Sequence, residues 1–216
     1  MGNIRILIVD DHDLVRIGLR HILSSGSGFE VVGESATGED ALRDLRNVTA
    51  DIVLLDISMP GLSGFEVCDR IHRHHKDTRI IMLTAHTQEP YPARLLKAGA
   101  SGFLTKASNA EELHTAIRCV NRGERYVSSQ IAQQLALSLL PGEGVSRFDE
   151  LSAREMEVMM MISQGVSVNT MADALSISPK TVATYKYRIF EKLEIRNEVA
   201  LVRLVIKHGL VESADL

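Results

Sequence analysis

Short apolar runs alternate with helix-like stretches over roughly the first 120 residues of the chain. The apolar runs are 4–9, 29–32, 51–55, 79–83 and 102–104. Stretches with helical periodicity follow them at 13–24, 39–46, 64–73, 89–98 and 109–121. Strands that are apolar throughout are typically covered on both faces. The pattern therefore predicts a doubly wound α/β fold, with a five-stranded parallel sheet between two layers of helices.

The pattern changes in the second half. Residues 128–140 read as one more helix, and residues 141–146 combine turn-forming residues with no periodicity, which is typical of a linker. Four helix-like segments follow, near 152–164, 168–175, 179–193 and 197–208. We therefore expect an α/β domain at 1–122, a helix and linker at 123–146, and a small all-α domain of four helices at 147–216.

Polar side chains follow four of the predicted strands, namely Asp10 and Asp11, Asp56, Thr84 and Lys106. Because the carboxyl ends of parallel strands meet at one edge of a sheet, we expect these side chains to converge there. Carboxylates crowd together only around a shared cation, and oxygen ligands favour Mg²⁺. A carboxylate beside that ion, with an ammonium group opposite, is suited to attack a phosphoryl group.

Helix-start signals divide the second half into short helices. Ser152 and Glu155 have capping-box spacing. Ser178 followed by Pro179 is typical of an N-cap and first helical position. Because only a short turn separates the segments at 168–175 and 179–193, together they predict a helix-turn-helix.

Periodicity assigns two faces to the second of these helices. The inward-facing residues are Val182, Tyr185, Ile189 and Leu193, and the outward-facing ones are Lys180, Ala183, Thr184, Tyr187 and Arg188. Residues 178–209 carry seven Lys or Arg against three Glu. The outer face thus offers groups that can contact phosphates and base edges, although an ordinary solvated helix would carry similar charges.

Composition narrows the function classes further. The net charge of −4 excludes a globally basic nucleic-acid binder, but it leaves room for a local basic face. Two cysteines are too few for a disulfide scaffold. No apolar run approaches the ~20 residues of a membrane span, and the N-terminus lacks the pattern of a secretory signal. We therefore expect a cytoplasmic protein with no membrane partner.

Four motifs in the first half resemble the receiver domain of two-component response regulators: "ILIVDDHDLVRIGL", "DIVLLDISMPGLSGFE", "IIMLTAH" and "GASGFLTK". The resemblance implies a flavodoxin-like strand order and phosphoryl transfer from a sensor histidine kinase to Asp56. It implies Mg²⁺ ligands at Asp10, Asp11, Asp56 and the Ser58 carbonyl, with Asp10 acting chiefly through metal-bound water. Thr84 and Lys106 would contact the phosphoryl group. Phe103 occupies the position of the aromatic switch, or else serves ordinary strand packing.

The segment "LSAREMEVM…GVSVNTMADALSISPKTVATYKYRIFEKL" resembles the DNA-binding domain of LuxR-type regulators. The resemblance implies that Ala183, Thr184 and Tyr187 face the bases. It offers phosphate-contact candidates at Lys180, Tyr185, Lys186, Arg188 and Lys192, with Thr181 completing the DNA-binding set. The last helix would supply a dimer interface at Val202, Val205 and Ile206, unless these residues pack inside their own domain.

Together the resemblances identify a regulator that binds double-stranded promoter DNA as a homodimer under the control of phosphorylation. Within the class, "TYKYRIFEKLEIRNEVAL" is similar to the Gac/Uvr-type global regulators that drive small regulatory RNA genes. The only chemistry expected is phosphate acceptance and self-dephosphorylation. Two alternatives stay open. One is a Mg²⁺-dependent phosphohydrolase, although Asp56-Ile57-Ser58 lacks the second acid of one large phosphatase group. The other is an adaptor whose helical domain binds protein.

Overall fold

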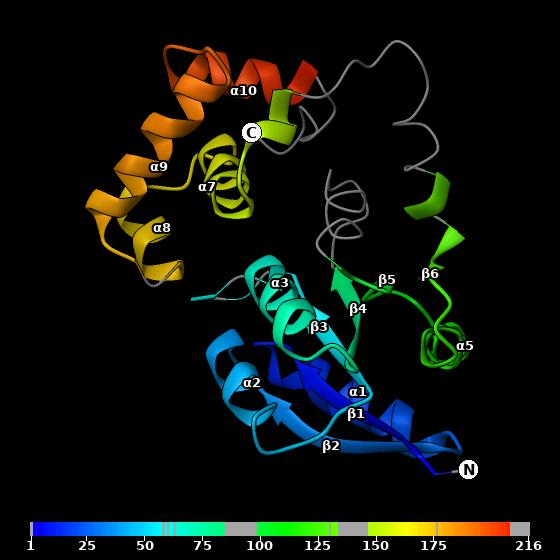
Figure 1. The fold of residues 1–216 in the computed structure, drawn as a ribbon. Coiled ribbons are helices and arrows are strands. Elements are labelled where there is room, and N and C mark those ends of the chain that lie inside the picture. The colour runs from blue at the N-terminus through cyan, green and yellow to red at the C-terminus, as the bar shows by residue number, and fades with distance from the viewer. Residues whose placement is uncertain are drawn as a thin grey trace. The chain divides into compact units, whose positions relative to one another are not determined.

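The computed structural model describes residues 2–57, 59, 61–62, 64–84, 99–129, 131–133, 147–175 and 177–207. The described residues up to 133 form one compact unit, blue to green in Figure 1, and those from 147 onward form a second. The helix predicted at 89–98 and the linker at 141–146 lie outside the described residues, and the domain boundaries at 122 and 146 stay predictions. Among the described residues, no helix has the length and hydropathy needed to cross a membrane.

The first unit is built on a parallel sheet of six strands in the order β2-β1-β3-β4-β5-β6. The strands are β1 Ile4–Val9, β2 Phe29–Ser35, β3 Ile52–Asp56, β4 Arg79–Thr84, β5 Gly102–Thr105 and β6 Tyr126–Val127. The doubly wound parallel sheet is confirmed, with six strands in place of the predicted five. The sixth strand escapes prediction because two residues after a polar stretch form no apolar run. Its backbone still pairs with β5.

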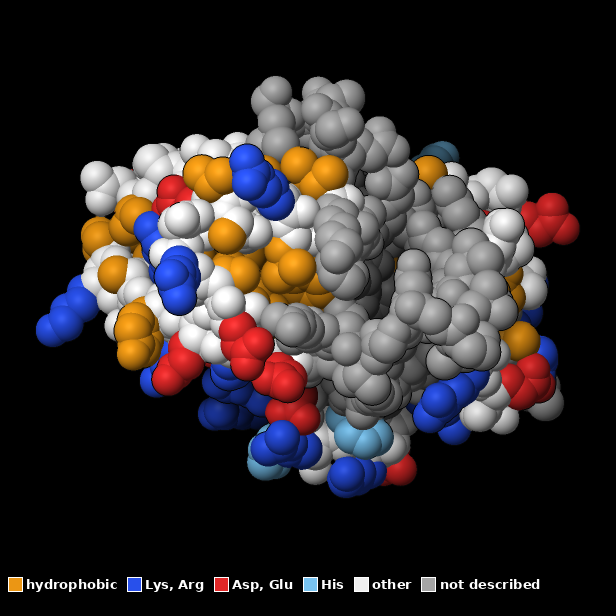
Figure 2. Space-filling model, turned by 90° about the horizontal axis from the view of Figure 1, so that it is seen from above, with side chains coloured by type: hydrophobic (Ala, Val, Ile, Leu, Met, Phe, Trp, Pro, Cys, Tyr) orange, Lys and Arg blue, Asp and Glu red, His pale blue; other side chains and the backbone are white. Residues whose placement is uncertain are grey.

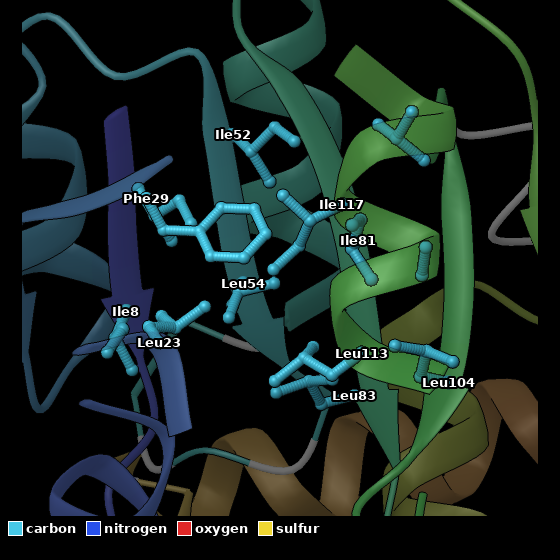
Figure 3. Close-up of a cluster of buried hydrophobic side chains, with 13 residues drawn as sticks. Ile8, Leu23, Phe29, Ile52, Leu54, Ile81, Leu83, Leu104, Leu113 and Ile117 are labelled. Carbon is cyan, nitrogen blue, oxygen red and sulfur yellow. The ribbon is translucent and has the colours of Figure 1, made fainter. Parts of the chain in front are cut away.

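Four helices described in this unit cover both faces of the sheet: α1 Asp13–Ser25, α2 Gly38–Asp44, α3 Gly64–His74 and α5 Ala110–Asn121. Leu23 of α1 and Ile117 of α5 lie in the cluster of buried side chains drawn in Figure 3. The sheet contributes alternate residues to that cluster, namely Ile6, Ile8, Ile52, Leu54, Ile81, Leu83 and Leu104. These residues therefore share one face of the pleat.

The intervening strand residues point to the opposite face. Leu7, Val53 and Leu55 are fully buried, as are Val67 and Cys68 of α3 on that side. Because the central strands β1, β3 and β4 bury side chains on both faces along most of their length, their sequences are apolar almost throughout, whereas the edge strand β2 carries the exposed Glu30. At the carboxyl edge of the sheet, polar residues follow these apolar runs, with Asp10 after β1 and Asp56 at the end of β3.

The second unit is helical throughout its described residues. A short 3₁₀ turn, η1 Arg147–Glu150, precedes four helices: α7 Ala153–Ser163, α8 Val168–Ala174, α9 Pro179–Lys192 and α10 Glu198–Lys207. The predicted capping box is present, since the Ser152 side chain accepts from the backbone of Glu155 and the Glu155 side chain accepts from the backbone of Ser152. Ser178 caps α9 with Pro179 in its first turn, also as predicted. Helices α8 and α9 form the predicted helix-turn-helix.

Helix α9 packs on both α7 and α8. Val182, Ile189 and Leu193 are fully buried, while Tyr185 is only half-buried. Three of the four predicted inward positions therefore lie in the core. The opposite face of α9 is left for contacts outside the unit.

Candidate functional site: an acidic pocket and an exposed helix face

The predicted acidic pocket forms at the carboxyl edge of the sheet. Asp10 follows β1 and is fully buried, and Asp56 ends β3 with its side chain 2% exposed. Lys106 follows β5, and its Nζ lies 2.7 Å from Asp10 Oδ2 and 3.0 Å from Asp56 Oδ2. The structure thus brings together residues separated by up to 96 positions in sequence, because parallel strands end at the same edge.

The charge on Lys106 is held in place by its neighbours. Burial lowers the pKa of the ammonium group, but the hydrogen bond to Asp10 and the contacts with Asp56 outweigh burial and raise the pKa above its ordinary value. Lys106 therefore stays positively charged across the physiological pH range. It is the single ammonium group in contact with these two carboxylates among the described residues.

The backbone around the pocket is closely fitted. Arg16 Nη1 donates to the carbonyl of Asp10 at 2.7 Å, and the His12 amide donates to Asp10 Oδ1 at 2.9 Å. A Cβ placed on Gly64 would lie 2.2 Å from the backbone carbonyl oxygen of Asp56. Only glycine allows that approach, so Gly64 is required for the position of the Asp56 backbone.

The donor set fits a divalent cation. Asp10, Asp11, His12 and Asp56 each offer a ligand atom, and these atoms all lie within 4.8 Å of one another. Three of the four donors are carboxylates, the ligands that Mg²⁺ prefers. His12 Nδ1 lies 2.8 Å from Asp11 Oδ1 and brings a nitrogen to the rim that the predicted ligand set did not include. The predicted Ser58 ligand lies outside the described residues.

Thr84 lies on β4, next to the strand that carries Asp56, and Phe103 lies on β5, one strand further along the sheet. Thr84 ends β4 and is 2% exposed. The Lys106 amide donates to the Thr84 carbonyl at 2.6 Å, which ties the two residues together through the backbone. Phe103 pairs with Met82 in the sheet and is 1% exposed. Its ring is buried in this structure, and a switching role for Phe103 stays a prediction.

The outer face of α9 carries the polar and basic residues predicted for it. Lys180, Ala183, Thr184 and Arg188 are exposed, and Tyr187 is 69% exposed. Thr181 is half-buried, and its hydroxyl lies 2.8 Å from that of the N-cap Ser178. The amide of Thr181 also donates to Ser178 Oγ, so this residue helps to start the helix. The exposed face is thus available for contacts outside the unit.

The basic residues of α9 differ in their partners. Lys186 Nζ lies 2.5 Å from Glu198 Oε1 and 5.6 Å from the centroid of the Phe190 ring. Lys192 Nζ lies 2.6 Å from the buried Glu155 Oε2 and donates to the Glu150 carbonyl at 3.0 Å. Lys192 therefore stabilises the fold of its own unit in this structure, a role that no sequence pattern predicted.

No ion pair is found for the other two basic residues of α9, Lys180 and Arg188, within the described part of the chain. Both side chains are exposed. Of the candidates for phosphate contacts, these two could therefore bind a phosphate without first breaking an ion pair inside the described part of the protein.

The residues proposed for dimer contact on α10 need one correction. Val205 is fully buried, so it follows the alternative of packing inside its own unit and is not available for a dimer contact, while Val202 and Ile206 are half-buried. The exposed apolar residue of the helix is Val199, at 62%. A hollow on this surface is lined by Ile195, Asn197, Val199, Ala200, Arg203 and Leu204. Figure 2 shows one face of the molecule, on which Lys and Arg side chains lie among hydrophobic ones.

Comparison with known proteins places these two sites in one architecture. Residues 6–118 match the response regulator receiver domain, and residues 149–205 match the bacterial regulatory proteins of the luxR family. The chain is 48% identical over 214 residues to the response regulator UvrY of Escherichia coli K12, covering 99% of this chain and 98% of UvrY. It is 46% identical over 213 residues to the response regulator GacA of Pseudomonas aeruginosa, covering 98% and 100%.

Solved structures of RcsB share the fold across both units. RcsB from Salmonella enterica serovar Typhimurium, solved bound to promoter rprA in the presence of phosphomimetic BeF₃⁻, matches with a TM-score of 0.65 and 26% identity, covering 94% of this chain and 98% of that one. A second structure, of two RcsB dimers bound to two parallel DNAs, matches with a TM-score of 0.60 and the same identity and coverage. The chain belongs to the two-component response regulators that join a receiver domain to a LuxR-family regulatory domain.

Proposed function

We propose that this response regulator accepts a phosphoryl group at Asp56 from a sensor histidine kinase and thereby controls its binding to promoter DNA. The observation that carries the proposal is the buried Asp56 carboxylate, which shares one ammonium group with Asp10 beside a third carboxylate, Asp11. Such a pocket has a surplus of negative charge that a divalent cation can balance, and it offers a carboxylate nucleophile.

In the proposed transfer, an oxygen of Asp56 forms a bond to phosphorus as the bond from phosphorus to a nitrogen of the kinase histidine breaks. Mg²⁺, when held by Asp10, Asp11 and Asp56, supplies positive charge to the phosphoryl oxygens. Lys106 offsets the rest of that charge from its position 3.0 Å from Asp56 Oδ2. The product is a mixed anhydride, which water hydrolyses, so self-dephosphorylation would end the signal.

The output we propose is recognition of double-stranded DNA by α9. Ala183, Thr184 and Tyr187 stand on its exposed face, suited to base edges, while Lys180 and Arg188 are suited to phosphates. The RcsB structures, bound to promoter DNA and as dimers on DNA, support this reading. We place a homodimer contact on α10 around Val199 and Arg203, joined by the half-buried Val202 and Ile206.

The extent of similarity to UvrY and GacA, which covers at least 98% of this chain, supports a global regulator. Following the resemblance to the Gac/Uvr-type regulators, we place promoters of small regulatory RNA genes among its targets. A protein that binds promoter DNA works where the DNA is, and we therefore place it in the bacterial cytoplasm.

The test compares the full chain with Asp56→Ala and with a control variant, Asp77→Ala, which removes an exposed carboxylate of the same unit. Each protein is incubated with Mg²⁺ and acetyl phosphate, and then acyl-phosphate formation is followed by mass and DNA binding by fluorescence anisotropy. Wild type and Asp77→Ala should gain one phosphoryl group and bind DNA more tightly, and Asp56→Ala should do neither. Phosphoryl incorporation that persists in Asp56→Ala would falsify the acceptor assignment.

A further inference from the structure

One basic residue of the recognition helix is engaged by an acidic residue of the next helix. Lys186 of α9 and Glu198, the first residue of α10, form an ion pair 2.5 Å long. The side chain of Lys186 is 32% exposed and that of Glu198 is 52% exposed, so water reaches both. The ring of Phe190, 5.6 Å from the ammonium group, gives Lys186 a second favourable contact in this position.

The pair differs from the neighbouring contact of Lys192. Glu155 is only 3% exposed and also accepts a hydrogen bond from the Ser152 amide, so releasing Lys192 would leave a buried carboxylate short of a partner. Releasing Lys186 leaves Glu198 in contact with water, at little cost. Lys186 is therefore the basic residue of α9 that can exchange an internal carboxylate for an external anion.

We propose that Glu198 competes with the DNA backbone for the Lys186 ammonium group and so lowers the affinity of α9 for DNA. The inference rests on the proposed DNA-binding function. A phosphate oxygen and a carboxylate oxygen offer the ammonium group the same kind of charge-assisted hydrogen bond, and Lys186 can make it with only one of them at full strength. Because an exposed ion pair is weak, the competition is graded and does not block binding.

The strength of the effect follows from the exposure of the pair. Exposed pairs of this kind correspond to a factor of roughly 1.5 to 5 in an equilibrium constant. Freeing Lys186 should therefore tighten DNA binding by about that factor. A lysine that newly neutralises a phosphate also releases counterions, so the slope of log K against log salt should become steeper by up to about 0.9.

The experiment is a double-mutant cycle in the full chain. Wild type, Glu198→Gln, Lys186→Gln and the double variant are titrated against a fluorescein-labelled 30-base-pair duplex of mixed sequence, with Mg²⁺ and acetyl phosphate present throughout. Glu191→Gln, alone and with Lys186→Gln, is the control, because Glu191 is exposed on α9 and forms no ion pair among the described residues. Thermal melting checks that each variant is folded, and Glu198→Asp, which shortens the side chain but keeps its charge, replaces Glu198→Gln if that variant melts early.

Glu198→Gln should lower the Kd about 1.5- to five-fold and steepen the salt dependence, and both gains should vanish in the Lys186→Gln background. Any gain from Glu191→Gln should be the same in both backgrounds, since it reflects only a lower negative charge near DNA. An equal gain from Glu198→Gln with and without Lys186, or no gain at all, overturns the inference while DNA binding stands. Absence of DNA binding in every protein overturns the proposed function, and the inference with it.

Discussion

The two units each contain a lysine in contact with a buried carboxylate, and they differ in how the charges balance. Lys106 in the receiver unit faces both Asp10 and Asp56, and Asp11 lies close to them, so the pocket keeps a surplus of negative charge. Lys192 in the helical unit faces Glu155 alone, with a neutral backbone carbonyl as its second partner. An ion pair whose charges cancel stabilises its own fold. A pocket with more negative than positive charge is stabilised further when it binds a cation. The imbalance therefore marks the candidate functional site.

The largest effect is expected from Lys106→Met, which leaves Asp10 and Asp56 buried without their ammonium group. Removing one partner of a buried pair costs about 3 kcal/mol, and this loss should appear in urea unfolding without metal. Mg²⁺ should restore part of it, because the ion supplies the missing positive charge. Lys106→Arg, which keeps the charge, is the control and should lose less. If Mg²⁺ stabilised Lys106→Met no more than wild type, the carboxylates would not be the metal site.

A smaller loss is expected from Lys192→Met, about 1–2 kcal/mol, because Lys192 is 35% exposed and Glu155 keeps its hydrogen bond from Ser152. Mg²⁺ should not restore this loss, because Glu155 belongs to no cluster of possible metal ligands among the described residues and a lone carboxylate holds the ion poorly. Urea unfolding of the full chain, with and without Mg²⁺, provides the measurement. Rescue by Mg²⁺ here would break the distinction between the two centres.

The contact between Lys192 and Glu155 also makes the stability of the fold depend on pH. Burial raises the pKa of Glu155, but the hydrogen bonds from Lys192 and Ser152 outweigh burial and hold it below its ordinary value. Because the folded-state pKa is depressed, this stabilisation is present above the unfolded-state pKa of about 4.3 and is lost as the pH falls through the folded-state pKa. In Lys192→Met the pKa of Glu155, followed by NMR, should rise toward its unfolded-state value, and the stability that this carboxylate loses in acid should become smaller. An unchanged pKa would show that the contact is absent in solution.

The smallest expected change in unfolding free energy has opposite signs at the two sites when one carboxylate is neutralised. Without metal, Asp11→Asn should raise the free energy of unfolding by about 1 kcal/mol, because it relieves repulsion among carboxylates whose ligand atoms lie within 4.8 Å. Glu155→Gln removes one charge from the balanced pair and should lower stability instead. Chemical unfolding in a chelator measures both. A loss of stability in Asp11→Asn would mean that the pocket carries no surplus repulsion.

The receiver pocket was predictable from sequence because it depends on strand ends, and strand ends follow from local apolar runs. Asp10, Asp56 and Lys106 each lie at the end of such a run, and the parallel topology brings them together. The sixth strand was not predictable, since Tyr126 and Val127 form no run of their own and pair only because β5 offers a free edge.

The partners of the basic residues on α9 could not be predicted. Glu155 lies 37 positions from Lys192, and Glu198 lies 12 positions from Lys186, so no spacing rule within one helix connects them. The burial of Val205 was ambiguous for a related reason. Helix α10 has apolar residues on more than one side, and only packing on α7 decides which of them are covered.

Glu155 takes part in two structures at once, and this has a consequence for the cooperativity of the helical unit. Its carboxylate accepts the Ser152 amide at the start of α7 and the Lys192 ammonium at the end of α9. Fraying at either helix end weakens the contact that secures the other, so the two ends open as one cooperative unit. The last turn of α9 is thus tied to the first turn of a helix that precedes it in the chain.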